Sequence, residues 1–152
     1  MKRFFLFIIM AFILSSCSQD NPFMKEWETP YGIPPFNEIK VSHYMPAIKE
    51  GIRQREAEIE AIIKNSEEAT FDNTIAAYEL SGELLSKVMG VLSNVSESDG
   101  TEEIIKLMEE VIPLLTGHED DIFMNKGFFN RVKAVYEELP RSEERRVGKE
   151  CR

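Results

Sequence analysis

Residues 42–65 read Ser-His-Tyr-Met-Pro-Ala-Ile-Lys-Glu-Gly-Ile-Arg-Gln-Arg-Glu-Ala-Glu-Ile-Glu-Ala-Ile-Ile-Lys-Asn, and this stretch decides the fold class. Its apolar residues recur mostly at steps of three and four, which places them on one face of an α-helix: Tyr44, Ala47, Ile48, Ile52, Ile59, Ile62 and Ile63. The charged residues fill the other faces: Glu50, Arg53, Arg55, Glu56, Glu58 and Glu60. Ser42 stands where it can cap the helix. The pattern predicts one amphipathic helix from Ser42 to about Asn65.

Two more long helical stripes follow it. Residues 70–74 offer several capping side chains, and a second stripe then runs from Ile75 to Val95. Gly82 and Gly90 inside it each weaken helix propensity by roughly 1 kcal/mol relative to Ala, and they leave room for another helix to approach. A third helix is expected near residues 99–102, which have capping-box spacing. Pro113 should kink this helix or end its first part.

The region after Gly117 is expected to hold a short turn or helix with Ile122 and Phe123, followed by a last helix from about Asn125. The apolar residues of that last helix that we expect to face inward are Phe129, Val132, Val135, Tyr136 and Leu139. No segment shows the sustained alternation of a β-strand, so the fold class is all-α. The sequence also contains no Gly-rich phosphate loop, no Cys-x-x-Cys pair and no basic-aromatic patch.

The first seventeen residues are typical of an export signal. Lys2 and Arg3 precede an uncharged run of about 11 residues, which is too short to span a bilayer as a stable helix. The run ends in Leu14-Ser15-Ser16-Cys17, which resembles a bacterial lipobox, in which the Cys carries the lipid. We therefore expect a signal peptide over residues 1–16 and a lipidated Cys17 with a tether over residues 17–22. The alternative is an ordinary signal peptide that contains a Cys at its end.

The charge and the cysteine content of the chain limit which classes of binding partner and which disulfides we expect. The chain has a net charge of −9, and removal of Lys2 and Arg3 with the signal would leave 16 basic against 27 acidic residues, a net charge of −11. Such a surface disfavours nucleic acid, because binding there depends on Lys and Arg neutralising phosphates. Lipidation of Cys17 leaves Cys151 as the remaining thiol, so no internal disulfide framework is expected. An acyl chain would hold the protein at a membrane surface in the cell envelope.

The segment from residue 21 to residue 40 is rich in proline and aromatic residues. Its four prolines forbid a continuous helix and predict extended pieces and turns: Pro22, Pro30, Pro34 and Pro35. Its aromatic residues are Phe23, Trp27, Tyr31 and Phe36, which are too many for a linker. We expect an ordered arm laid across a neighbouring surface, with its rings buried.

His118-Glu119 matches the first half of the zinc-peptidase motif H-E-x-x-H. The motif needs a second imidazole four residues on, because residues i and i+4 share a helical face and both rings must reach one ion. That position is Ile122, and the other histidine, His43, is far away in sequence. We therefore predict no metal site and no catalytic residue here, and interpret His118-Glu119 as an exposed polar pair near a helix end.

Three blocks in register nevertheless resemble a known family. They are Asn21-Pro22-Phe23 with residues 29–36 (TPYGIPPF), residues 39–47 (IKVSHYMPA) with Gly51 and Glu58-Ile59, and residues 70–75 (TFDNTI) with residues 81–85 (SGELL). Their order and spacing resemble the amino-terminal region of the peptidyl-dipeptidases, or dipeptidyl carboxypeptidases, in the thimet oligopeptidase family of zinc metallopeptidases. The similarity runs from about residue 21 to residue 139.

The resemblance implies a large, almost wholly helical hydrolase with two lobes, of which this chain is the amino-terminal fragment. In that family zinc is held by the two His of H-E-x-x-H and a downstream Glu, and oligopeptides are cleaved to release carboxyl-terminal dipeptides. Those residues belong to the carboxyl-terminal half of the family, so residues 23–140 correspond to helical scaffold without catalytic or zinc-binding residues. The chain alone is expected to bind no zinc and to be inactive as a protease.

Residues 141–152 depart from the family. They read RSEERRVGKECR, five basic against three acidic residues, with no amphipathic stripe. We interpret this tail as a frameshifted or artefactual end, and a natural basic tail is the alternative. At the level of function, the alternative to a fragment of a lipid-anchored peptidase is a non-catalytic helical lipoprotein that binds a partner protein or peptide.

Overall fold

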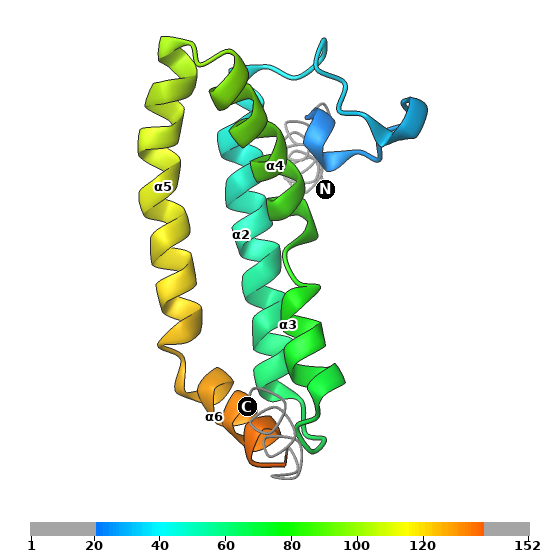
Figure 1. Ribbon diagram of the computed structural model, residues 1–152, viewed down its shortest axis with the longest axis vertical. Helices are drawn as coiled ribbons and strands as arrows, with labels where there is room; N and C mark the ends of the chain where they lie inside the picture. The colour runs from blue at the N-terminus through cyan, green and yellow to red at the C-terminus, as the bar shows by residue number, and fades with distance from the viewer. Residues whose placement is uncertain (1–20, 139–152) are drawn as a thin grey trace, which may run out of the picture. The chain divides into compact units, whose positions relative to one another are not determined.

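The computed structural model describes residues 21–138, which contain α-helices and no β-strand (Figure 1). The α-helices are α2 (Val41–Lys64), α3 (Ala77–Glu79), α4 (Glu83–Ser98), α5 (Glu102–Phe123) and α6 (Lys126–Glu138). The 3₁₀ turns η2 (Pro22–Met24) and η3 (Pro30–Gly32) precede them, and a π-helical turn, η4 (Phe71–Ala76), precedes α3. The all-α prediction is confirmed. The predictions for Cys17, Leu139 and the 141–152 tail lie outside the described residues.

The described residues divide into two compact units. Residues 21–50 with 84–108 form the first unit, and residues 51–83 with 109–138 form the second. The buried apolar residues of the first unit come from η2, the start of α2, α4 and the start of α5: Phe23, Tyr44, Ala47, Ile48, Leu85, Val88, Val91, Leu92, Ile104 and Leu107. Each of these elements therefore contributes its apolar stripe to the interior, as the sequence pattern predicts.

The segment before α2 is attached to the first unit through its first turn. Phe23 is buried, and its ring centroid lies 5.1 Å from that of Tyr44. Asn21 caps η2 by accepting from the Phe23 N–H at 3.1 Å, and its own amide donates to the His43 carbonyl at 2.8 Å. The ammonium group of Lys87 on α4 donates to the Phe23 and Lys25 carbonyls at 3.2 and 2.7 Å. It also lies 4.2 Å from the centroid of the Trp27 ring.

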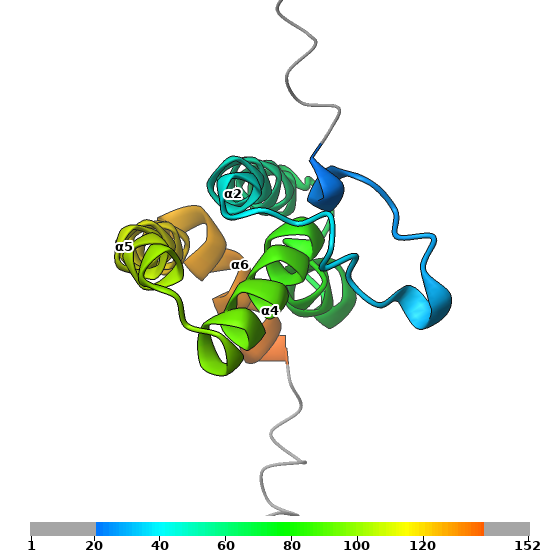
Figure 2. The same cartoon turned by 90° about the horizontal axis from the view of Figure 1, so that it is seen from above.

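Beyond Trp27 the prediction of buried rings is wrong. Tyr31 is 98% exposed and Phe36 is 53% exposed. Figure 2 shows the reason: after η2 the chain swings away from α4 in a loop before it returns to the start of α2. Pro30 and the left-handed Tyr31 and Gly32 hold this loop in a turn of its own, so the Tyr31 side chain meets no neighbouring helix.

Two details at the start of α2 differ from the prediction. The helix begins at Val41, so Ser42 lies inside its first turn and does not precede it. His43 takes part in capping instead, because its Nδ1 accepts from the Lys40 N–H at 3.1 Å. Imidazole reaches back across one turn as the Glu of a capping box does. The predicted end near Asn65 agrees with the last helical residue, Lys64.

The second unit is built around a cluster of four buried residues, which are Ile59, Ile62, Ile122 and Phe128. Ile63, Ala77, Tyr78 and Val132 pack against it. The segment between α2 and η4 is fixed by Arg131 of α6, whose guanidinium donates to the Asn65 carbonyl and to the Asn73 side chain, each at 2.8 Å. Thr70 and Asn73 form a reciprocal capping box at the start of η4. Capping was therefore placed correctly at residues 70–74.

The second stripe is not one helix. It breaks after Glu79 and resumes at Glu83, and Gly82 in the break has φ +78°. A Cβ atom on Gly82 would lie 2.6 Å from Arg55 Cδ, so this glycine does permit the close approach of α2. Gly90 does not, because a Cβ there would have nothing within 4 Å. The apolar residues keep their helical spacing across the break, so this spacing did not predict the positive φ of Gly82.

Gly82→Ala should therefore destabilise the chain. The new methyl group has both an unfavourable φ and a side-chain clash, which together should lower the free energy of unfolding by about 1–3 kcal/mol. Gly90→Ala is the matched control, since it lies inside α4 in open space and should stabilise by up to about 1 kcal/mol. Urea denaturation followed by circular dichroism measures both. Shifts of equal size and sign would contradict the role of Gly82.

Helices α5 and α6 also correct the sequence analysis. Pro113 does not end the first part of α5, because the helix runs unbroken to Phe123, and the alternative of a kink at Pro113 stays a prediction. Its buried face continues on both sides of the proline at steps of three and four, through Val111, the half-buried Leu115, His118 and Ile122. Burial of that face offsets the single lost backbone hydrogen bond.

The inward face of α6 is displaced from the prediction. Phe128 is buried, whereas Phe129 and Tyr136 are 60% and 67% exposed. The sequence of α6 contains two possible apolar stripes, one with Phe128 and one with Phe129. Both include Val132 and Val135, so the spacing alone did not predict which stripe is buried. Gly127 decides the matter, since its Cα approaches Ile63 so closely that a Cβ would lie 2.6 Å from a methyl carbon of that residue. None of the helices within residues 21–138 combines the length and the apolar character needed to cross a bilayer.

Candidate functional site

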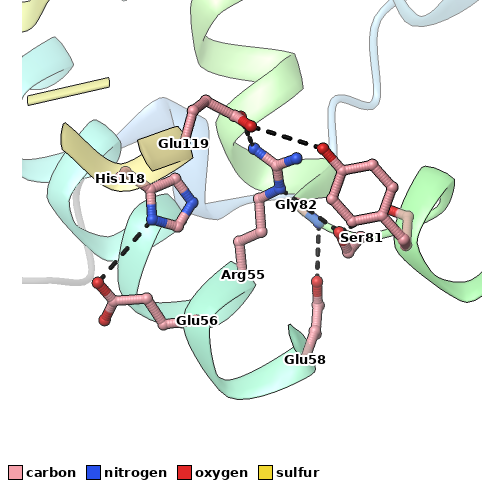
Figure 3. Close-up of polar contacts among 8 residues, drawn as sticks. Arg55, Glu56, Glu58, Ser81, Gly82, His118 and Glu119 are labelled. Carbon is pink, nitrogen blue, oxygen red and sulfur yellow. Dashed lines mark hydrogen bonds and ion pairs between the residues drawn. The ribbon is translucent and has the colours of Figure 1, made fainter. Parts of the chain in front are cut away.

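A connected polar group among the described residues of the second unit surrounds Arg55 (Figure 3). Its guanidinium Nη1 donates to Glu119 Oε1 of α5 and forms an ion pair with that carboxylate. Its guanidinium carbon lies 5.4 Å from the centroid of the Tyr78 ring, and its Nε donates to Ser81 Oγ at 3.4 Å. We call Arg55, Tyr78, Ser81 and Glu119 the Arg55 cluster.

The Arg55 cluster is partly shielded from water. The Arg55 side chain is 13% exposed, and that of Glu119 is 39% exposed. Burial raises the pKa of Tyr78, and the Glu119 carboxylate raises it further while Arg55 opposes the shift. Tyr78 therefore stays a neutral phenol, whose hydroxyl donates to Glu119 Oε2 at 3.5 Å. Each residue of the cluster has a polar contact with at least one other member, which is the arrangement of a structural brace.

The turn before α4 is tied to α2 next to this cluster. Gly82 donates its N–H to Glu58 Oε2 at 2.7 Å, and Ser81 Oγ donates to the Tyr78 carbonyl at 2.6 Å (Figure 3). The hydroxyl of Ser81 is thus committed to a backbone carbonyl and to Arg55. Within residues 21–138 no imidazole contacts this hydroxyl, as an activated serine nucleophile requires.

His118 is buried, so the interpretation of His118-Glu119 as an exposed pair is wrong. Its side chain is 2% exposed, and Glu119 is engaged by Arg55. The carboxylate oxygen Glu56 Oε1 lies 3.9 Å from Nδ1 of the ring. Neither ring nitrogen has a hydrogen-bond partner within the described part of the chain. The physical reason for burial is the register of α5, in which position 118 falls on the face that also carries Val111 and Ile122.

The described residues do not fit a zinc site. Nowhere in residues 21–138 do three His, Cys, Asp or Glu side chains converge on a position that could hold a metal ion. His43 belongs to the first unit, at the start of α2, and His118 belongs to the second. A catalytic zinc takes three protein ligands and leaves one position open. No catalytic step through a metal is therefore derived from these side chains.

Sequence analysis missed the two most informative residues of this unit. Arg55 was placed on a face other than the apolar one, yet it stands three residues after Ile52 and four before Ile59, on the apolar stripe itself. His118 likewise follows the buried stripe of α5. A polar residue in register with an apolar stripe was the signal available in both cases. Cys17, the predicted lipidation site, lies outside the described residues.

Comparison with known proteins identifies the family. The chain is 38% identical over 118 residues to the dipeptidyl carboxypeptidase of Salmonella typhimurium and 39% identical over 117 residues to that of Escherichia coli. These matches cover 78% and 77% of the chain. An oligopeptidase A of Salmonella typhimurium is 21% identical over 102 residues. No protein-family model matches the chain.

The relatives that these matches name are peptidases. The chain belongs to the thimet oligopeptidase-like family, and it shares almost twice as much identity with the two dipeptidyl carboxypeptidases as with oligopeptidase A. It spans 17% of the length of those two dipeptidyl carboxypeptidases.

Proposed function

We propose that this chain is a non-catalytic, amino-terminal helical part of a lipid-anchored zinc metallopeptidase of the peptidyl-dipeptidase type. The observation that carries the proposal is the 38–39% identity to two dipeptidyl carboxypeptidases over more than three quarters of the chain. In this proposal the helices serve as scaffold and channel wall, and the substrates are oligopeptides. Zinc and the residues that bind it reside in polypeptide other than this chain.

The side chains of the second unit support a scaffold role. The charged groups of the Arg55 cluster are paired with one another and not directed at a shared open position. General acid–base catalysis needs a titratable group within hydrogen-bond reach of the substrate. An internally paired arginine, phenol and carboxylate instead fix α2 against α5 and the turn before α4. In this proposal the Arg55 cluster stabilises the channel wall and takes no part in catalysis.

Membrane attachment through Cys17 is the second element of the proposal. The sequence Leu14-Ser15-Ser16-Cys17 supports it, because the Cys stands where a lipobox requires one after an apolar run. Diacyl attachment supplies many buried CH₂ groups at about 0.8 kcal/mol each and needs no spanning helix. The enzyme would then act in the bacterial cell envelope, on the periplasmic side or at the outer membrane.

The chain alone should neither cleave peptides nor bind zinc stoichiometrically. Purified 152-residue chain is incubated with a blocked tetrapeptide, and release of the carboxyl-terminal dipeptide is followed by chromatography with and without a chelator. Metal content after dialysis is measured by mass spectrometry. We expect a rate equal to the buffer blank and well under one zinc per chain. Chelator-sensitive hydrolysis, or one zinc per chain, would contradict the assignment of catalysis to other polypeptide.

A chimera tests the scaffold role directly. Residues 21–138 replace the matching segment of the Escherichia coli dipeptidyl carboxypeptidase, and the same peptide assay is applied. If these helices form an equivalent wall, the chimera should keep chelator-sensitive activity within about tenfold of the parent, because a scaffold change perturbs positioning without removing a reacting group. A chimera that is monomeric, folded and loaded with zinc but inactive would overturn the proposal.

A further inference from the structure

His118 stands at a cavity in the second unit that the proposed function does not use. The cavity has a volume of about 170 Å³ and is lined from α2, from α5 and from the residue before α6. The lining residues are Glu56, Ile59, Glu60, Ile63, His118, Asp121, Ile122 and Asn125. Three isoleucines give it apolar walls, and the polar groups converge on it from two helices.

The imidazole of His118 is the buried polar group of this cavity. Its side chain is 2% exposed, and both ring nitrogens lack a hydrogen-bond partner among the described residues. The closest carboxylate oxygen, Glu56 Oε1, is 3.9 Å from Nδ1, which is beyond hydrogen-bond distance (Figure 3). Buried polar side chains in native proteins nearly always have a partner, and each exception calls for an explanation.

The polar lining of the cavity is acidic. Glu56, Glu60 and Asp121 contribute three carboxylates, and no Lys or Arg is among the eight lining residues. Glu56, Glu60 and Asp121 are exposed, so the carboxylates lie toward solvent while His118 is buried. Glu60 also pairs with Lys64 at 2.7 Å. A neutral imidazole offers one acceptor, and each carboxylate offers two oxygens. The cavity therefore presents several separated acceptors to whatever enters it.

A metal ion does not suit this arrangement, because three of its donors do not converge on one point. Separated acceptors around apolar walls suit a cation that carries several N–H donors on a short carbon stem. We propose that the His118 cavity binds an alkylammonium or guanidinium group, with the charge balanced by Glu60 and Asp121 and an N–H donated to the His118 ring. The group comes either from a Lys or Arg side chain or from the amino terminus of a peptide.

Nuclear magnetic resonance of the ¹⁵N-labelled 152-residue chain tests this proposal. At about pH 8, the His118 ring signals are followed while ethylguanidinium or butylammonium chloride is added. We expect saturable shifts with a dissociation constant in roughly the millimolar range, as suits a ligand of few atoms. Tetramethylammonium has the same charge but no N–H donor, so it should leave the ring signals unchanged.

A pair of charge-matched variants separates site binding from general attraction to an acidic protein. Glu60→Gln with Asp121→Asn removes two lining carboxylates and should weaken binding by on the order of fivefold. Glu109→Gln with Glu110→Gln removes the same charge from exposed positions of α5 outside the cavity and should leave binding unchanged. The unfolding midpoint gives a second readout, because a ligand that binds only the folded state raises it with the logarithm of the ligand concentration once that exceeds the dissociation constant.

Three compounds distinguish the sources of the cation. Nα-acetyl-lysine amide and Nα-acetyl-arginine amide carry only a side-chain cation, and alanyl-alanine amide carries only a peptide amino terminus. Saturation by either of the first two assigns the cavity to a side chain, and saturation by the third alone assigns it to a peptide amino terminus. The proposal is overturned if no N–H cation shifts the ring signals, if tetramethylammonium shifts them equally, or if the lining variant binds as well as the control. None of these results depends on peptidase activity, so they leave the proposed function to its own tests.

Discussion

A chain carrying Cys17→Ser should be recovered almost entirely in the soluble fraction, whereas the unmodified chain should sediment with membranes. The difference is expected to be large because anchoring depends on acyl chains at that one sulfur. At about 0.8 kcal/mol for each buried CH₂, two acyl chains bind a membrane with an affinity that polar surface contacts do not approach. Ultracentrifugation of cells expressing each form, combined with incorporation of a clickable fatty-acid analogue, measures both attachment and its chemistry.

Cys151→Ser is the matched control for this experiment, since it removes the other thiol of the chain. It should keep both the label and the membrane fraction. If the unmodified chain is unlabelled and soluble, the lipobox interpretation is wrong, and residues 1–17 act as an ordinary signal. If Cys17→Ser is still labelled to the same extent, the acylated residue is another one.

Replacement of Arg55 by Met should lower the free energy of unfolding by about 2–3 kcal/mol. The guanidinium is buried on an apolar stripe, and its loss leaves the Glu119 carboxylate without the cation that balances it. Breaking a fully buried pair costs about 3–5 kcal/mol, and the partial exposure of Glu119 reduces that figure. Met preserves most of the apolar stem, so the measured loss reports mainly on the ion pair and the contact with Tyr78. Urea denaturation provides the measurement.

A double-mutant cycle with Glu119→Gln isolates the pair itself. Residues in one ion-pair network usually couple by about 0.5–3 kcal/mol, and we expect a value above 1 kcal/mol here. Lys133→Met is the control, because Lys133 and Glu137 form an exposed pair on α6 that should contribute at most about 0.5 kcal/mol. An Arg55→Met chain as stable as Lys133→Met would show that the Arg55 cluster is not a brace.

The fold class and the long helices followed from apolar spacing because each stripe covers several turns. Helix α2 agrees with its prediction to within one residue at each end, since its stripe is uninterrupted and its flanks are polar. The predicted helix boundaries and faces were wrong where a single residue determines them. Gly82 has a positive φ in the break directly before α4, and Gly127 selects the buried face of α6 through its contact with Ile63. Such effects depend on a contact with a residue distant in sequence, and the apolar spacing of one helix carries no information about that contact.

The polar residues of the second unit were harder to place for a related reason. Charge predicts exposure unless a partner compensates it, and Glu119 lies 64 residues from Arg55 in sequence. The comparison of His118-Glu119 with the zinc motif shows only that position 122 is Ile and not a second His. It gave no information about the burial of His118, which follows from the register of α5.

The contact between Lys87 and the Trp27 ring gives the chain an internal optical reporter. Trp27 is the one tryptophan in the sequence, so intrinsic fluorescence arises from a single, known location. Its indole N–H donates to the Pro22 carbonyl at 3.0 Å, and the ammonium group lies over its π face. Release of the η2 turn from α4 would remove that cation and hydrate the indole, which shifts the emission to longer wavelength. Detachment of this turn can therefore be timed separately from helix unfolding, without any added label.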